Sequence, residues 1–163
     1  CRLARANAPQ SRNPQMSDQK TGCKACVANA NLSSDSHVVW QNGLWVLRHT
    51  KPPYAALGWM TLHSQRHAPA FTQLTPEELA DLGPTIAKIS EAIIEATGAL
   101  RVYIAPMTET TPHFHAHLIP RYEGGPKGWE TFKLKDMAKV SPPDISAQAV
   151  QEVIRKVASQ LAA

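Results

Sequence analysis

Three histidines alternate with apolar residues in the run His-Phe-His-Ala-His-Leu-Ile-Pro-Arg at positions 113–121. A period of two is typical of a β-strand, in which residues i, i+2 and i+4 share one face. We therefore expect His113, His115 and His117 on one surface, with the apolar residues packed behind them. A neutral imidazole is a nucleophile near pH 7, and it can attack phosphorus to form a covalent intermediate. The alternative, a solvated strand face, would more commonly carry Thr, Lys or Glu.

A Cys-x-x-Cys unit formed by Cys23 and Cys26 is a second candidate site. The chain has three cysteines, which do not make a disulfide framework, and in a reducing compartment this spacing suggests a metal or redox site. No strand–helix–strand pattern of the thioredoxin type surrounds the pair, which disfavours a redox role. Two reduced cysteines without a ligand are the plain alternative.

The elements that must position these residues begin with a β-hairpin. Residues 38–41 and 44–47 flank Asn42-Gly43, and this dipeptide favours a type I′ turn, whose two central residues need a positive φ. Pro52 and Pro53 then interrupt the chain, and residues 57–62 are predicted to form a third strand. Residues 100–104 and the histidine run supply a fourth and a fifth strand.

A long helix is predicted to begin at Pro76. Thr75 can cap this helix, Pro76 suits its first turn, and Glu78 completes a capping box. Gly98 suits the position just after its end. The apolar stripe of the helix consists of Leu79, Leu82, Ile86, Ile89 and Ile93.

The last part of the chain holds an irregular segment and a second helix. Residues 123–144 carry several glycines and prolines and are predicted to be irregular. The amphipathic helix after Ser146 is marked by Val150, Val153, Ile154, Val157 and Leu161. The order of elements predicts an α+β fold, with a roughly five-stranded antiparallel sheet, one long helix packed on it and a C-terminal helix.

Length and charge limit the classes of function. A chain of 163 residues is most simply one domain, which we place at residues 22–163, and no stretch is apolar enough to cross a membrane. Residues 1–21 are predicted to be a disordered tail. Most of the net charge of +4 lies in this tail, so general nucleic-acid binding is not expected. The cytoplasm is the expected location, unless the Arg-rich tail is the remnant of an organellar transit peptide.

The spacing of His113, His115 and His117 resembles the signature of the histidine triad (HIT) family. Residues 118–121 also resemble that family, and a weaker resemblance covers residues 23–122. The resemblance implies the HIT-like α+β fold and a nucleotide hydrolase or nucleotidyl transferase. In such enzymes the middle histidine attacks an α-phosphate to form a nucleotidyl-histidine, and its other nitrogen donates to the backbone carbonyl of the third position. By position, His115 is the nucleophile and His117 the third member.

The resemblance also indicates further site residues. A Gly-Gln-Ser-like stretch of the family corresponds to residues 108–110, where Thr110 keeps a hydroxyl that could bind a phosphate oxygen or protonate the leaving group. The family holds the ribose by an acid or amide near Arg48 or His49, neither of which is a carboxylate. Arg48 could instead attract a second phosphate or a sulfate, with a surface arginine as the plain alternative. The expected catalytic residues are His115, His117 and Thr110, and the expected substrate-binding residues are His113, Thr110, His117 and Arg48.

Members of the family with an N-terminal Cys-x-x-Cys bind zinc. The ligands that the resemblance assigns here are Cys23, Cys26, His67 and His113. Two thiolates and two imidazoles make a closed tetrahedral site with a structural role. His63, four residues before His67, could replace it as ligand or face the triad. The remaining histidines, His37 and His49, have no evident partner and are expected at the surface.

The resemblance further implies a homodimer formed through the long helix and a sheet edge. The expected substrates are dinucleoside polyphosphates, nucleoside phosphoramidates or adenylyl sulfate, and the sequence does not distinguish among their leaving groups. The alternatives are a nucleotidyl transferase like hexose-1-phosphate uridylyltransferase, and a nucleotide-binding interaction protein with little turnover.

Overall fold

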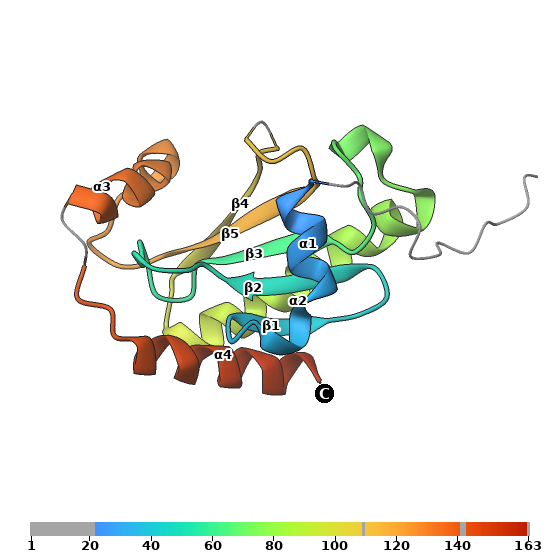
Figure 1. Ribbon diagram of the computed structural model, residues 1–163. Helices are drawn as coiled ribbons and strands as arrows, with labels where there is room; N and C mark the ends of the chain where they lie inside the picture. The colour runs from blue at the N-terminus through green and yellow to red at the C-terminus, as the bar shows by residue number, and fades with distance from the viewer. Residues whose placement is uncertain (1–21, 109, 141–142, 163) are drawn as a thin grey trace, which may run out of the picture.

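The computed structural model describes residues 22–108, 110–140 and 143–162. It contains an antiparallel five-stranded sheet in the order β1-β2-β3-β5-β4 (Figure 1). The strands are β1 (Val38–Gln41), β2 (Trp45–His49), β3 (Met60–Ser64), β4 (Arg101–Pro106) and β5 (His115–Arg121). The predicted α+β fold is confirmed, whereas the predicted disorder of residues 1–21 lies outside the described residues.

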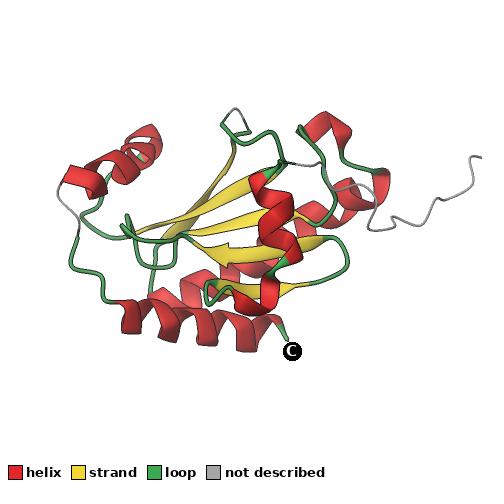
Figure 2. Cartoon of the chain, in the orientation of Figure 1, coloured by secondary structure: helices red, strands yellow, loops and turns green. Residues whose placement is uncertain are grey.

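Helices lie on both faces of this sheet (Figure 2). The α-helices are α1 (Lys24–Ala30), α2 (Pro76–Thr97), α3 (Leu134–Val140) and α4 (Ala147–Leu161), and the short 3₁₀ helices are η2 (Leu32–Ser34), η3 (Phe71–Gln73) and η4 (Gly128–Lys133). Helices α2 and α4 pack on one face, and α1 crosses the other (Figure 1). No helix among the described residues is long and apolar enough to span a membrane.

The long helix α2 follows the sequence prediction closely at both ends. Thr75 Oγ1 accepts from the backbone N–H of Glu78, and the Glu78 carboxylate accepts from the backbone N–H of Thr75, which is the predicted capping box. Gly98 follows the helix with a φ of 71°, a conformation that glycine adopts without steric cost. Ile89 and Ile93 are fully buried against the sheet, but Leu79 at the edge of the predicted stripe is 43% exposed.

The hairpin of β1 and β2 is confirmed, but its turn is not of type I′. The Asn42 backbone N–H donates to the Trp45 carbonyl, so Gly43 and Leu44 occupy the centre of the turn. Among the described residues, only glycines other than Gly43 have a positive φ. The side-chain oxygen of Asn42 accepts from the backbone N–H groups of Leu44 and Trp45, at 2.8 and 2.7 Å. This side-chain oxygen closes the turn without a left-handed backbone.

Helices occur around the two cysteines, where the sequence predicts no element, and in the segment that was predicted to be irregular. Cys23 stands at the N-terminal cap of α1, and Cys26 lies within that helix rather than in a loop. The segment 123–144 contains η4 and α3, and Leu134 and Ala138 pack in an apolar cluster with Trp59. Burial against the sheet stabilises these short helices, and such burial cannot be predicted from the local sequence pattern.

Strand β5 has the two different faces that its alternation predicts. Phe114, Ala116 and Leu118 belong to the main apolar core between the sheet and helices α2 and α4. The intervening histidines lie on the opposite face of the sheet, the face that α1 crosses. Strand β3 pairs with β5 so that His63 is opposite His115 and Thr61 is opposite His117. The sheet therefore presents imidazoles from two neighbouring strands on one surface.

A pair of substitutions in α2 tests this placement of the core. Ile89→Ala should lower the free energy of unfolding by roughly 2–5 kcal/mol, because a buried side chain is lost and leaves a cavity. Leu79→Ala, on the same helix but half-exposed, should lower it by less than about 1 kcal/mol. Urea unfolding of both variants measures the difference, and equal losses would contradict the assignment.

Candidate active site and metal centre

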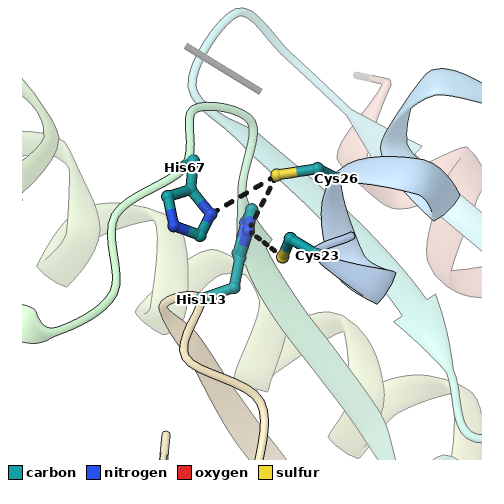
Figure 3. A group of neighbouring side chains, drawn as sticks. All are labelled: Cys23, Cys26, His67 and His113. Carbon is teal, nitrogen blue, oxygen red and sulfur yellow. Dashed lines mark hydrogen bonds between the residues drawn. The ribbon is translucent and has the colours of Figure 1, made fainter. Parts of the chain in front are cut away.

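Four side chains from three distant parts of the chain converge at the start of β5 (Figure 3). The ligand atoms of these residues all lie within 4.8 Å of one another, and the residues are Cys23, Cys26, His67 and His113. Cys26 Sγ is 3.4 Å from His67 Nδ1 and 3.5 Å from His113 Nδ1, and Cys23 Sγ is 3.6 Å from the same His113 nitrogen. Tetrahedral zinc with sulfur at ~2.3 Å and nitrogen at ~2.0 Å implies about 3.5 Å between sulfur and nitrogen. The donor set and its spacing therefore fit a tetrahedral zinc ion.

His113 is oriented for this role by its second ring nitrogen. Nε2 lies 2.8 Å from the backbone carbonyl of Ser64, and because a carbonyl only accepts, this nitrogen carries the proton. The lone pair of Nδ1 then points toward the two sulfurs. Burial lowers the pKa of His113, which favours the neutral ring that a metal needs.

His63 lies outside this group of four. It therefore does not replace His67 as a candidate metal ligand. Its ring stacks on the ring of His115, with centroids 5.3 Å apart and planes 17° apart. Burial, and then the proximity of His115, lower its pKa well below the usual value. His63 therefore stays uncharged beside His115 at neutral pH.

The middle histidine of the triad has a defined tautomer. His115 Nδ1 lies 2.8 Å from the backbone carbonyl of His113 and must donate to it. The lone pair is thus on Nε2, as a nucleophile requires. The resemblance implies that the carbonyl of His117 accepts this bond. In the structure the acceptor is instead the carbonyl of His113, the first histidine of the triad. The reason is local, since His113 precedes β5 and its carbonyl is directed at the ring two residues later.

His117 has the opposite tautomer. The buried indole of Trp59 donates from Nε1 to His117 Nδ1 at 3.2 Å, so the proton of the neutral imidazole is on Nε2. Burial lowers the pKa of His117 from 6.5 to about 3, and the positive charges of Lys135 and His115 act in the same direction. His117 is therefore a neutral hydrogen-bond donor next to the candidate nucleophile His115. Trp59 was not singled out from the sequence; its position two residues before Thr61, which pairs with His117, places both on the histidine face of the sheet.

Arg48 lies on the same face of the sheet as the triad, in register with Thr61. It is only 6% exposed, so the alternative of a surface arginine is wrong. Its Nε is 3.6 Å from Asp35 Oδ2, and neither Nε nor Nη2 has a hydrogen-bond partner among the described residues. Burial lowers the pKa of Arg48. A buried guanidinium with unused donors is a candidate anion ligand.

The expected surface position of His49 is also wrong. The ring is 1% exposed, donates from Nδ1 to the Thr50 carbonyl and accepts at Nε2 from the backbone N–H of Gly58. It therefore holds together the segment that leads into β3. His37 is half-buried and lies 3.2 Å from the hydroxyl of Tyr54.

Thr110 is exposed in the loop before β5. It lines a cavity of about 290 Å³ together with Cys23 and His67, next to the four candidate metal ligands. Its predicted contact with a leaving group stays a prediction, and the neighbouring Glu109 lies outside the described residues.

Removal of the indole donor tests the assigned tautomer of His117. In Trp59→Phe, the Nε2–H form of His117 should lose its dominance, and nitrogen-15 shifts of the ring measure this directly. Trp45→Phe is the matched control, because Trp45 is equally buried but its Nε1 donates to Asp81. An unchanged His117 spectrum in Trp59→Phe would contradict the assignment.

Solved structures with the same fold include three proteins of comparable length. A zinc-bound histidine triad family protein from Mycobacterium smegmatis has a TM-score of 0.64 and 19% identity, over 86% of this chain and 98% of that one. A Hit-like protein involved in cell-cycle regulation from Bartonella henselae has a TM-score of 0.61 and 18% identity, over 82% and 92%. A hypothetical histidine triad nucleotide-binding protein from Sulfolobus tokodaii has a TM-score of 0.61 and 17% identity, over 84% and 93%.

A search of curated proteins found no significant match. The sequence model of the HIT domain matches residues 31–124, which is more than half of the chain and includes the whole histidine run. The chain therefore belongs to the HIT domain family.

Proposed function

We propose that the protein is a nucleotide hydrolase or nucleotidyl transferase in which His115 attacks an α-phosphate. The observation that carries this proposal is the pair of opposite tautomers on neighbouring histidines. His115 has its lone pair on Nε2 because Nδ1 donates to a carbonyl. His117 has its proton on Nε2 because Nδ1 accepts from Trp59. One ring can attack phosphorus while the other donates to a developing negative charge.

The reaction follows from these two rings. His115 Nε2 forms a bond to phosphorus as the bond between phosphorus and the leaving group breaks. The positive charge that develops on the His115 ring is stabilised by the Nδ1–H bond to the His113 carbonyl. His117 donates from Nε2 to an oxygen of the phosphoryl or leaving group. Water or another acceptor then attacks phosphorus, the bond from phosphorus to His115 breaks, and the proton of that water passes to solvent.

The substrates that we propose are dinucleoside polyphosphates, nucleoside phosphoramidates or adenylyl sulfate. Arg48 supports an anionic substrate, because Nη2 of its buried guanidinium has no hydrogen-bond partner among the described residues, while Nε lies 3.6 Å from the Asp35 carboxylate. We assign it to a phosphate or sulfate oxygen, and Thr110 to the leaving group. Both ring nitrogens of His113 are engaged within the protein, so we propose that His113 acts on the substrate through the carbonyl that orients His115.

We propose a structural zinc ion held by the four converging ligands. All four positions of a tetrahedral ion are then filled by the chain, and the metal would link the N-terminal helix α1 to the start of β5. Its location between these segments supports a role in fixing His113, and through that residue the ring of His115. The zinc-bound relative from Mycobacterium smegmatis is consistent with this proposal.

We propose a homodimer formed through the long helix α2 and the edge of the sheet. β4 is the last strand in the sheet order. Leu100, Ile104 and Met107, in and beside this strand, are 52, 40 and 47% exposed. A second copy of the chain would cover these apolar side chains and pair with the open edge.

The nucleophile is tested by His115→Asn. Turnover should fall by about three orders of magnitude or more, or at least ~4 kcal/mol of transition-state stabilisation, because the covalent route is lost. Nucleotide binding should persist within about tenfold, since the pocket is intact. Rapid quenching of the unaltered enzyme should trap a nucleotide on His115. His37→Asn is the control, because His37 bonds Tyr54 outside the triad. Normal turnover of His115→Asn, or a label on another residue, would overturn the mechanism.

The zinc site is tested by two histidine substitutions that are four residues apart. His67→Gln should lose the metal and destabilise the protein, because metal binding is coupled to folding. His63→Gln should keep the metal, since His63 stacks on His115 and is not one of the four ligands. Elemental analysis of protein purified without chelator gives the zinc content. Metal loss in the second variant alone would reverse the assignment.

The dimer is tested by light scattering at micromolar concentration. Ile104→Lys should shift the protein toward the monomer, because it places a charge on the proposed interface. Val27→Lys on α1 is the control, as Val27 is 58% exposed and lies away from β4. A monomer in the unaltered protein would contradict the proposal.

A further inference from the structure

Two arginines face each other across the pair of strands at the edge of the sheet. Arg101 on β4 is directly opposite Arg121 on β5 in the antiparallel register. Directly opposed residues lie on one face with their Cβ atoms about 5 Å apart, and like charges there destabilise a sheet. Together with Lys127 and Tyr103, these arginines line a cavity of about 240 Å³. Three of the four lining side chains are therefore cations.

The positive charge of this cavity is not neutralised within the described residues. No ion pair among them joins Arg101, Arg121 or Lys127 to a carboxylate. Arg121 Nε is buried and has no hydrogen-bond partner there. The Tyr103 hydroxyl accepts from the backbone N–H of Gly128 at 3.2 Å, so its own proton is available to a ligand. The side chains that line the cavity thus present three cations and one hydroxyl proton to a ligand.

We propose that this cavity binds a phosphate group, either as free phosphate or as part of a nucleotide. A guanidinium presents paired N–H groups that match two oxygens of a phosphate, and two opposed guanidinium groups can share one such anion. The ammonium of Lys127 and the hydroxyl of Tyr103 supply further donors. An oxyanion in this position removes the repulsion between the two arginines.

The cavity is separate from the triad. Arg121 follows His117 by four residues on β5, which corresponds to about 13 Å along a strand. Between them, Ile119 is fully buried in the apolar cluster that contains Trp59 and Ala138. This cluster covers the sheet face between the two places. The inference therefore goes beyond the proposed function and does not require that His115 reacts.

Phosphate binding to three variants tests the proposal. Inorganic phosphate is titrated by calorimetry against chloride at equal ionic strength. The double variant R101Q/R121Q should weaken binding by tenfold or more. Arg155→Gln, an exposed arginine on α4, should leave binding unchanged, and so should His115→Asn. Unchanged binding in R101Q/R121Q would overturn the proposal, and so would loss of binding in His115→Asn, which would place the phosphate at the triad.

Thermal unfolding provides a second test, in which Tm should change in opposite directions without and with phosphate. Without phosphate, Arg101→Gln should raise Tm, because one of two repelling charges is removed. Phosphate should raise the Tm of the unaltered protein but not that of the variant. The proposal would be contradicted if, without phosphate, Arg101→Gln had a lower Tm than the unaltered protein and if phosphate raised the Tm of both proteins equally. A nucleoside monophosphate is then titrated against the unaltered protein and against R101Q/R121Q: a binding event that is lost in the double variant shows that the cavity accepts a nucleotide, and a loss seen with inorganic phosphate alone shows that it accepts only free phosphate.

Discussion

His113 joins the two chemical centres of this protein through a single residue. Its ring lies between Cys23, Cys26 and His67, and its backbone carbonyl accepts a hydrogen bond from Nδ1–H of His115. The position of this residue therefore fixes both a set of metal ligands and the tautomer of the candidate nucleophile. It is held by the Ser64 carbonyl at the end of β3, so the pairing of β3 with β5 determines the arrangement of both centres.

Because polar and apolar residues alternate in β5, one face of the strand belongs to the core and the other to the candidate active site. Its apolar residues are part of the core against α2 and α4, while its histidines meet His63 and Trp59 on the other face. A shift of one residue in register would place imidazoles in the core. The burial of Phe114 and Leu118 therefore sets the direction of His115 and His117 as firmly as any contact in the site itself.

The sequence predicts the parts of this structure that have short-range periodic signals. The capping box at Thr75, the alternation around His115 and the helix after Ser146 are all present at the expected places. The family resemblance places four ligands that no local pattern could bring together. Sequence did not predict the helical setting of Cys26, because a helix of seven residues depends on burial against the sheet. It also missed the burial of Arg48 and the bond from Trp59 to His117, which arise from register between strands far apart in the chain.

The bond between Trp59 and His117 has an optical consequence. An indole that touches a charged imidazole loses fluorescence, whereas one that touches a neutral ring keeps it. Because the pKa of His117 is about 3, its ring stays neutral over the whole range in which proteins are usually handled. The emission of Trp59 should therefore be indifferent to pH in that range. The chain has four tryptophans, so in a variant that keeps only Trp59 a change in emission would report displacement of His117.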